Sequence, residues 1–391
     1  MTARIFKLFG ACLVLLLFVS CSYQPDQERR GNAQPQLPRA LVPAAEYQVL
    51  LDAPGTDLVG WTGDASVASG RFRVQGAAAQ LKHAIAFPND RPYFVTGEAV
   101  LAPKTTTNLR LLSGTDTLVQ VTIEDLTASL HNAAGKVRNA GTVGKVFRFY
   151  LWHNPVSSVG RVWLQDDPTS GPRYLGEFTQ VGTADGFEVK HGSENGNILT
   201  LSNIIAAPVY ALAHGDSRVA GHNAYDPYPG LYQSNDLDSS FPHRVYLNKG
   251  AYVINGGRGG ASYSFNASRL ADLLRFEPKV VVLGTSNMFE TLQDQKALIR
   301  QMADDAHAAG AAVVLTEFTP VDDQDKLHLR EALNTWMSDL ARTRGYLLAS
   351  FYETLSDGGT ELADLYDVGD GVHLSARGYQ VMGDTISALL P

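Results

Sequence analysis

Ser217, Asp370 and His373 are the residues of this chain whose types and spacing best fit nucleophilic catalysis. A serine hydroxyl becomes a good nucleophile when a histidine takes its proton and an aspartate orients that histidine. Ser217 closes a His-Gly-Asp-Ser segment at 214–217, and Asp370 lies three residues before His373, so that both could reach one serine. A Gly-Asp-Ser tripeptide is equally typical of a turn that leads into a helix N-cap. By itself it leaves both interpretations open.

The elements that must position these residues alternate between strands and helices after Pro208. Apolar segments that read as buried strands are separated by stretches in which apolar residues recur every three or four positions. The predicted strands are 209–213, 251–254, 279–283, 311–316 and 346–349, and the clearest helices are 291–309, one that carries Leu329, Leu333, Trp336, Met337 and Leu340 on one face, and 375–390. This order predicts an α/β fold with a doubly wound parallel sheet, whose ligand crevice lies at the carboxyl ends of its strands. Ser217 follows the first strand, and His373 precedes the last helix.

Four short blocks in this half resemble the SGNH (GDSL) hydrolase superfamily. They are Gly-Asp-Ser at 215–217, Asn-Gly-Gly-Arg-Gly-Gly at 255–260, Leu-Gly-Thr-Ser-Asn at 283–287 and Asp-Gly-Val-His at 370–373. The resemblance covers residues 208–391 and implies a flavodoxin-like fold with an ester hydrolase site. It also implies that Ser217 is the nucleophile, His373 the general base and Asp370 the group that orients the imidazole.

The same resemblance implies an oxyanion hole, a set of donors that stabilises the negative oxygen of the tetrahedral intermediate. Its members would be the backbone N–H groups of Ser217 and Gly260 and the side-chain amide of Asn287. Gly257 is the alternative to Gly260 in the second block. The third block departs from the family, which usually has one residue between the glycine and the asparagine, whereas this chain has two between Gly284 and Asn287.

Residues 46–207 have a different periodicity, with short alternating segments separated by Gly, Asn, Asp and Pro. Examples are 71–75 and 161–165. Period two predicts half-buried strands, and turn signals every dozen or so residues favour an antiparallel β-sandwich that resembles the concanavalin-like or jelly-roll type. We therefore expect two folded domains, the sandwich over 46–207 and the hydrolase domain over 208–391.

The N-terminal segment predicts export and anchoring. A basic start and an apolar run over 8–19 are typical of a secretory signal, and residues 17–21 (Leu-Phe-Val-Ser-Cys) resemble a bacterial lipobox. We expect a signal peptide over 1–20, a lipid on Cys21 and a flexible tether over 21–45 that is rich in Pro, Gln, Asn and Arg. The protein would be exported and lipid-anchored to the bacterial cell envelope, at the outer membrane in a Gram-negative host. The alternative is an ordinary cleaved signal with an incidental cysteine.

Arginine and histidine residues near the predicted site have a structural interpretation that we prefer to a functional one. Arg218 and Arg258 flank the site and could bind an anionic substrate group, but surface arginines are common. His214 and His222 lie near Ser217 in the sequence and could line the pocket. A structural hydrogen-bonding role is the more ordinary one for both histidines.

The first half offers no pattern that is typical of a metal site. Its histidines are isolated and lack metal-ligand spacing, so that no metal and no other cofactor is expected. These histidines are His83, His131, His153 and His191. Trp61, Trp152 and Trp163 could form a sugar-stacking platform, although aromatic residues buried in a sandwich core are more common.

Hydrolases of this superfamily act on acetylated glycans, lipids, aryl esters or thioesters, so that the surroundings of the site must select among them. The added sandwich is of a type often used to bind glycans, which favours removal of O-acetyl groups from a polysaccharide, with an acylated glycan or a small ester as partner. A formal net charge of −8 argues against nucleic acid as a partner. Two alternatives stay open: an acetyltransferase that uses the same triad on a cell-envelope glycan, and a glycan-binding surface lipoprotein with an inactive hydrolase domain.

Overall fold

Residues 41–391 are described by the computed structural model, except for 54, 56, 133–134, 167–170, 194, 222–239, 287–288 and 322–326. Cys21, the predicted signal peptide and most of the predicted tether lie outside the described residues. Within the described part of the chain, no helix has both the length and the apolar character needed to cross a membrane.

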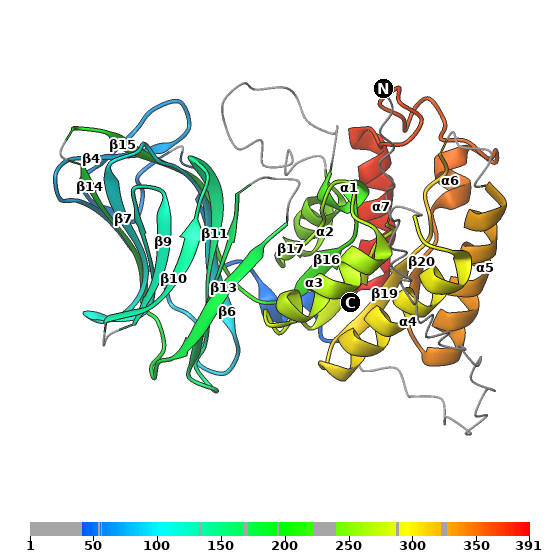
Figure 1. Ribbon diagram of the computed structural model, residues 1–391, viewed down its shortest axis with the longest axis horizontal. Helices are drawn as coiled ribbons and strands as arrows, with labels where there is room; N and C mark the ends of the chain where they lie inside the picture. The colour runs from blue at the N-terminus through cyan, green and yellow to red at the C-terminus, as the bar shows by residue number, and fades with distance from the viewer. Residues whose placement is uncertain are drawn as a thin grey trace, which may run out of the picture. The chain divides into compact units, whose positions relative to one another are not determined.

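Two antiparallel sheets face each other in the N-terminal half, as the alternating pattern predicts (Figure 1). The first has the strand order β13-β12-β11-β6-β15-β4-β3, with β1 paired to β15, and the second has the order β10-β9-β8-β7-β14-β5-β2. The strands are β1 (Leu51–Ala53), β2 (Trp61–Gly63), β3 (Ala65–Val67), β4 (Phe72–Gln75), β5 (Ala79–Ala84), β6 (Tyr93–Val100), β7 (Thr105–Ser113), β8 (Asp116–Glu124), β9 (Thr127–Asn132), β10 (Gly135–Thr142), β11 (Val146–Asn154), β12 (Val159–Gln165), β13 (Arg173–Thr179), β14 (Gly186–Ser193) and β15 (Ile198–Pro208). In β4, Phe72 and Val74 enter the core between the sheets while Arg73 and Gln75 are exposed, which is how period two produces one buried face.

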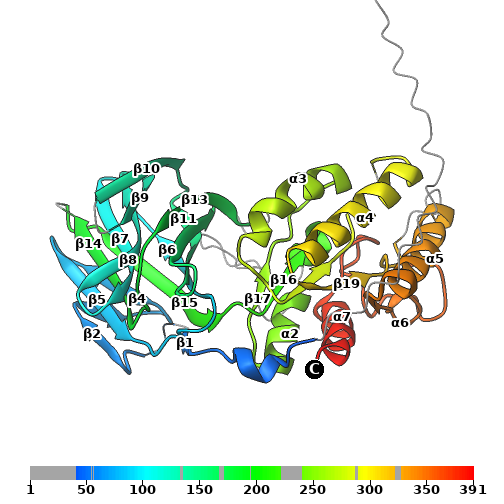
Figure 2. The same cartoon turned by 90° about the horizontal axis from the view of Figure 1, so that it is seen from below.

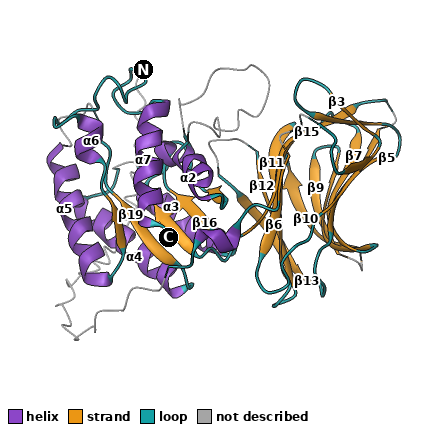
Figure 3. Ribbon diagram, turned by 180° about the vertical axis from the view of Figure 1, so that it is seen from behind, coloured by secondary structure: helices purple, strands orange, loops and turns teal. Residues whose placement is uncertain are grey.

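The C-terminal half contains a five-stranded parallel sheet with helices on both faces (Figures 2 and 3). Its strands, in the spatial order β17-β16-β18-β19-β20, are β16 (Ala211–His214), β17 (Val253–Asn255), β18 (Val280–Leu283), β19 (Ala312–Thr316) and β20 (Leu347–Ala349). Its helices are α1 (Ser217–Ala220), α2 (Phe241–Lys249), α3 (Tyr263–Leu274), α4 (Leu292–Ala308), α5 (Leu327–Arg344), α6 (Tyr352–Ser356) and α7 (Ala376–Leu389). Side chains of α3, α4 and α5 pack on one face of the sheet, and those of α2, α6 and α7 pack on the other. This is the flavodoxin-like order, which confirms the predicted fold.

The segment that precedes the sandwich packs on the C-terminal domain. Ala44 and Tyr47 of the 3-10 helix η1 (Ala44–Tyr47) are buried in the core that includes α2 and α7. Strand β1 follows and pairs with β15, so that the chain enters and leaves the sandwich side by side. Packed structure therefore begins inside the predicted tether 21–45. The local sequence does not indicate this, because the apolar side chains that bury Ala44 and Tyr47 belong to residues far along the chain.

Trp152 and Trp163 lie between the sandwich and the C-terminal domain, and both are fully buried. The Trp163 ring stacks on that of Phe276 with 3.7 Å between ring centres. Trp152 Nε1–H donates a hydrogen bond to the Phe276 carbonyl oxygen over 3.0 Å. These two tryptophans thus belong neither to a sugar-stacking platform nor to the sandwich core. Trp61, in contrast, is partly buried and packs against the sandwich core.

Replacing Trp163 with alanine is expected to lower the free energy of unfolding by about 3–5 kcal/mol, because it leaves a cavity against Phe276 in a fully buried interface. Denaturant titration followed by circular dichroism measures this loss. Trp61→Ala is the matched control and should cost less, since the Trp61 ring is only partly buried. Equal losses for the two variants would contradict the packing described for Trp163.

Candidate active site

Strand β16 delivers Ser217 to the carboxyl edge of the parallel sheet, where Ser217 becomes the first residue of α1. Asp216 is the N-cap of that helix, and its Oδ1 accepts a hydrogen bond from the Arg218 backbone N–H over 2.9 Å. A Cβ atom at Gly215 would lie 2.7 Å from the Thr285 carbonyl oxygen. Only glycine therefore permits this tight turn beside the end of β18.

Ser217, His373 and Asp370 form a continuous chain of hydrogen bonds. His373 Nε2 lies 3.0 Å from Ser217 Oγ, and His373 Nδ1 lies 2.7 Å from Asp370 Oδ2. The serine and the histidine are 156 positions apart in the sequence, and they meet because the loops after β16 and before α7 lie at the same edge of the sheet. When Nδ1–H is donated to the carboxylate, Nε2 carries the lone pair that accepts the serine proton.

Hydrogen bonds keep Asp370 ionised and fix the loop that carries it. Burial alone would raise the pKa of Asp370, but donors that include the backbone N–H and the ring of His373 outweigh it and lower the pKa to about 2. Asp367, which the sequence analysis does not identify, accepts hydrogen bonds from the N–H groups of Gly369 over 2.9 Å and Gly371 over 3.0 Å. An aspartate shortly before glycines is a known turn signal, so that the pattern around Asp367 could have indicated this role.

The loop 256–260 brings further backbone donors to the side of Ser217. Arg258 N–H donates to the Gly215 carbonyl oxygen over 3.0 Å, which anchors the loop against the nucleophile turn. Ser217 N–H occupies the first position of a helix, where backbone donors have no intrahelical acceptor. Gly260 has a φ of +72°, and its N–H has no protein acceptor among the described residues. Both N–H groups thus have no protein acceptor among the described residues.

The backbone N–H of Gly257, the alternative donor, already has an acceptor in the protein. It donates to Asn255 Oδ1 over 3.0 Å. A Cβ atom at Gly257 would overlap the backbone of α1 at Ala220, so that the glycine allows the loop to approach the nucleophile helix closely. This geometry favours Gly260 over Gly257 as an oxyanion donor.

Two residues expected near the site, Asn287 and His222, lie outside the described residues. The part of the third block that is described lies where the resemblance implies. Thr285 and Ser286 are buried, and the Thr285 carbonyl oxygen accepts a hydrogen bond from the Asp216 N–H over 3.0 Å. The third block therefore contacts the nucleophile turn directly.

Comparison with known proteins agrees with this geometry. Residues 213–381 match the model of the GDSL-like Lipase/Acylhydrolase family. This part of the chain therefore resembles a GDSL-like lipase/acylhydrolase domain. No curated protein matches the chain.

Several solved structures resemble the GDSL-like fold, and three of them each cover 46% of this chain. A putative lipolytic protein of the G-D-S-L family from Desulfitobacterium hafniense is 22% identical, with a TM-score of 0.40 and 99% of its own chain covered. A putative acylhydrolase from Bacteroides fragilis is 20% identical, with a TM-score of 0.38 and 86% of its chain covered. A lipase/acylhydrolase from Enterococcus faecalis is 20% identical, with a TM-score of 0.38 and 94% of its chain covered.

In the GDSL-like domain, Arg218 serves the fold. Its guanidinium group pairs with the Asp216 carboxylate, donates to Thr319 Oγ1 over 3.2 Å and lies 5.9 Å from the centre of the Phe318 ring. Arg218 is 5% exposed and Asp216 is 0% exposed. Removal of either member of such a buried pair leaves an uncompensated charge and is strongly destabilising. We therefore infer that the pair stabilises the turn that carries Ser217.

His214 is enclosed behind the nucleophile turn. Its ring nitrogens lie 3.2 Å from the Gly256 carbonyl oxygen and 2.9 Å from the Asn266 carbonyl oxygen. Burial lowers the pKa of His214 to about 4, although both carbonyl contacts favour the protonated ring. The ring therefore ties β16 to the loop 256–260 and to α3, in the structural role preferred from the sequence.

Acidification is expected to destabilise the protein in a pH window that His214 helps to set. The unfolded chain binds a proton at this residue below about pH 6.5, whereas the folded protein excludes it down to about pH 4, so that stability is lost as the pH falls through this range. At pH 4 this residue lowers the free energy of unfolding by about 3 kcal/mol relative to neutral pH. Urea denaturation measures the free energy of unfolding at pH 7 and at pH 4.5. Between these pH values it should fall less for His214→Gln than for the parent.

The control for this pH experiment is His328→Gln, because His328 is exposed. Its stability should depend on pH as that of the parent does. If His214→Gln also kept the full pH dependence of the parent, the buried ring would not be its cause.

The buried histidines of the sandwich also serve the fold. His153 Nδ1 lies 3.0 Å from the Tyr93 hydroxyl oxygen, and His191 Nδ1 lies 2.9 Å from Thr107 Oγ1. Burial lowers the pKa of both histidines. Across the described ranges, no group of three or more His, Cys, Asp or Glu side chains is placed to hold a metal ion.

Proposed function

We propose that this protein is a serine esterase that removes O-acetyl groups from a polysaccharide. Ester hydrolysis in general is the activity of the GDSL-like lipase/acylhydrolase family, whose model matches residues 213–381. The observation that supports Ser217 as nucleophile is its hydrogen-bonded connection to His373 and, through it, to Asp370. Folding alone does not require this arrangement, which favours an enzyme over a glycan-binding protein with an inactive domain.

In the first half of the proposed reaction, His373 Nε2 takes the Ser217 hydroxyl proton as Oγ attacks the acetyl carbonyl carbon. The negative oxygen of the tetrahedral intermediate accepts hydrogen bonds from the N–H groups of Ser217 and Gly260, with Asn287 as the third proposed donor. His373 then gives its proton to the sugar oxygen, the bond from the acetyl carbon to that oxygen breaks, and the deacetylated glycan leaves. Asp370 stays ionised and stabilises the imidazolium.

In the second half, a water molecule replaces the glycan. His373 takes a proton from the water, whose oxygen attacks the carbonyl carbon of the acetyl group on Ser217. The second tetrahedral intermediate breaks down to acetic acid, which ionises to acetate in solution, and His373 returns the proton that it took from the water to Ser217 Oγ. The same residues thus act twice, and no other reactant is required.

The sandwich supports a glycan as substrate. Polar side chains on its second sheet hold one another in place: Arg110 pairs with Glu188 over 3.1 Å and donates to Gln120 Oε1 over 2.8 Å. Gln120 and Glu188 are buried and Arg110 is partly exposed, so that Arg110 is the member of this cluster that a sugar hydroxyl could reach. The buried contacts of Trp152 and Trp163 pack the sandwich against the esterase domain. The inference from sandwich to glycan is an analogy at the level of fold.

Labelling with a fluorophosphonate tests the proposed function most directly, because this reagent reacts with activated serines. The full chain should be labelled at Ser217 and should release acetate from an acetylated polysaccharide. A series of 4-nitrophenyl esters should show falling kcat/KM as the acyl chain lengthens beyond acetyl. An unlabelled Ser217 in folded protein would exclude a serine esterase, and a preference for long acyl chains without release of acetate from any glycan would exclude the proposed substrate.

An acetyltransferase would use the same residues, and the products distinguish the two activities. When an acetyl donor and a glycan acceptor are supplied together, an esterase yields free acetate. A transferase yields acetylated acceptor instead. A predominance of acetylated acceptor would replace the proposed hydrolase with the transferase.

We also propose that Cys21 anchors the protein to the cell envelope, as the lipobox-like sequence before it indicates. Growth with an alkyne-labelled fatty acid should tag the full chain, and Cys21→Ser should lose both the tag and the membrane association. An untagged parent would favour an ordinary cleaved signal.

A further inference from the structure

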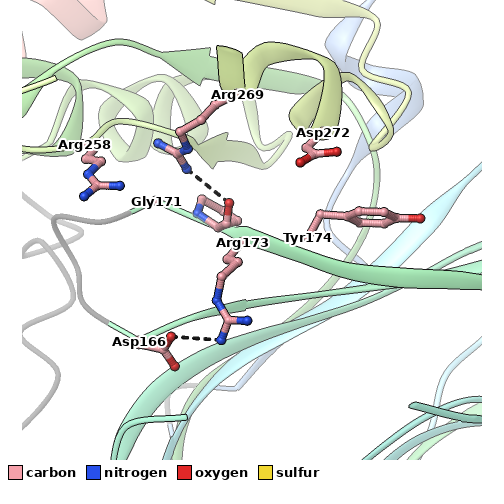
Figure 4. Close-up of a pocket in the computed structure, with 8 residues that line it drawn as sticks. Asp166, Gly171, Arg173, Tyr174, Arg258, Arg269 and Asp272 are labelled. Carbon is pink, nitrogen blue, oxygen red and sulfur yellow. Dashed lines mark hydrogen bonds and ion pairs between the residues drawn. The ribbon is translucent and has the colours of Figure 1, made fainter. Parts of the chain in front are cut away.

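A cavity of about 300 Å³ opens between the sandwich and the loop that follows β17 (Figure 4). The sandwich supplies residues at and before β13, and the esterase domain supplies residues of α3 and of the loop 256–260. Its lining residues are Asp166, Gly171, Pro172, Arg173, Tyr174, Arg258, Arg269 and Asp272. This volume is at the lower end of the range for ligand pockets, and no residue of the triad lines it.

The carboxylates of this cavity are already paired. Asp166 lies 3.2 Å from the Arg173 guanidinium, and Asp272 lies 3.5 Å from that of Arg275. Arg258 and Arg269, in contrast, form no ion pair with any residue that the structure describes. Two guanidinium groups of the cavity therefore have no ion-pair partner among the described residues.

Arg269 is held so that one of its donors has no partner. Its Nη2 donates to the Pro172 carbonyl oxygen over 3.1 Å, whereas its buried Nη1 makes no hydrogen bond with any described residue. A buried donor without a partner costs free energy unless a ligand or water supplies an acceptor. Gly171, which passes this guanidinium, has a φ of +66°, a conformation that favours glycine.

Arg258 lies beside Arg269 although their charges repel. The guanidinium carbons lie 4.4 Å and 5.5 Å from the centre of the same Phe265 ring, and Figure 4 draws the Arg269 side chain between those of Arg258 and Asp272. Burial and the charge of Arg258 lower the pKa of Arg269 to about 10. An anion between the two guanidinium groups would relieve both the repulsion and the unpaired donor.

The position of Arg258 connects this cavity to the reacting atoms. Its backbone N–H donates to the Gly215 carbonyl oxygen, and Gly260, the proposed oxyanion donor, is two residues further along the same loop. A group held by the Arg258 side chain thus lies next to the loop that faces Ser217. An ester substrate that extends from Ser217 past this loop would bring its neighbouring sugar to the cavity.

We propose that Arg258 and Arg269 form a subsite for the anionic group of an acidic sugar, so that the preferred substrate is an acetylated acidic polysaccharide. The inference rests on the proposed esterase function and narrows its substrate class. A carboxylate and a sulfate ester both present oxygens that guanidinium donors bind, and an uncharged sugar would leave both charges without a partner.

Binding to the Ser217→Ala variant of the full chain tests the subsite without any turnover. Isothermal titration compares trigalacturonate, galactotriose and a sulfated galactan oligosaccharide. We expect at least one of the two acidic probes to bind more tightly than galactotriose, and the stronger of them identifies the anionic group. Adding Arg269→Met or Arg258→Met should weaken that binding about 10- to 100-fold, the range for a hydrogen bond between charged groups.

Arg342→Met is the matched control, because Arg342 is an exposed arginine of α5 that pairs with Asp339 and does not line the cavity. It should leave binding of the acidic probe within about twofold of the parent. Arg258 is exposed, so that Arg258→Met keeps the test valid even if Arg269→Met fails to fold.

The subsite is excluded if the parent binds neither acidic probe better than galactotriose, or if both arginine variants bind the acidic probe as the parent does. The proposed esterase function fails separately, through absence of fluorophosphonate labelling at Ser217. A protein that is labelled and cleaves 4-nitrophenyl acetate but does not discriminate between acidic and neutral glycans would keep its esterase function and lose this substrate assignment.

Discussion

Replacing Ser217 with alanine is expected to lower kcat for ester hydrolysis by about a million-fold, the scale on which serine hydrolases respond to loss of the nucleophile. The variant lacks the atom that attacks the carbonyl carbon, whereas the N–H groups of the proposed oxyanion hole are retained. The small residual rate would come from those donors and from substrate binding. The measurement is kcat with 4-nitrophenyl acetate, together with loss of fluorophosphonate labelling.

Ser262→Ala is the matched control for this experiment. Ser262 is also a serine at a helix N-terminus of the same domain, where its Oγ accepts a hydrogen bond from the Phe265 N–H. Its removal should cost about 1 kcal/mol of stability and leave labelling and kcat unchanged. Retention of more than about one hundredth of the parent activity in purified Ser217→Ala would show that another group is the nucleophile.

Asp370→Asn is expected to reduce kcat by about ten-thousandfold with little change in KM. An amide at this position can present an N–H toward His373 Nδ1, which turns the imidazole to the tautomer that cannot accept the Ser217 proton. The carboxylate also accepts the His373 backbone N–H over 2.8 Å, so that the substitution disturbs the loop as well. Steady-state kinetics with a short-chain ester measure the loss.

The charge of Asp370 should not limit activity at moderately acidic pH, because its pKa is held at about 2. Its contribution to stability is present above about pH 3.8 and is lost as the pH falls toward 2. Asp364→Asn, an exposed aspartate in the same region, should keep the parent kcat. A fall of less than tenfold for Asp370→Asn would contradict its role in orienting His373.

The α/β half of the fold could be predicted because its signals are local. The segment 209–213 is apolar on both faces, and the same is true of 279–283, since each strand of the doubly wound sheet is covered by helices on two sides. The blocks around Ser217 and His373 were detectable because both lie at positions where a parallel sheet places ligands. The contact between Ser217 and His373, however, joins residues 156 positions apart and is seen only in the folded structure.

The roles of several residues could not be predicted because their partners are distant in the chain. The burial of Trp163 depends on Phe276, more than a hundred positions away. Arg218 pairs with Asp216 in a turn whose burial follows from Thr319 and its neighbours. Asp367 was missed for a different reason: its signal is local but resembles that of many turns.

The adjacent entry and exit of the sandwich make it, in topological terms, an insertion in the C-terminal domain rather than a module placed before it. A truncated protein that starts at Val209 would lack the apolar side chains of Ala44 and Tyr47 and would uncover the α2 and α7 face that they seal. An excision that joins Gln48 to Val209 through a short linker would keep both, since the ends of β1 and β15 already lie side by side. Excision of the sandwich as a single cassette would therefore keep the contacts of Ala44 and Tyr47 but would uncover the Phe276 ring on which Trp163 stacks.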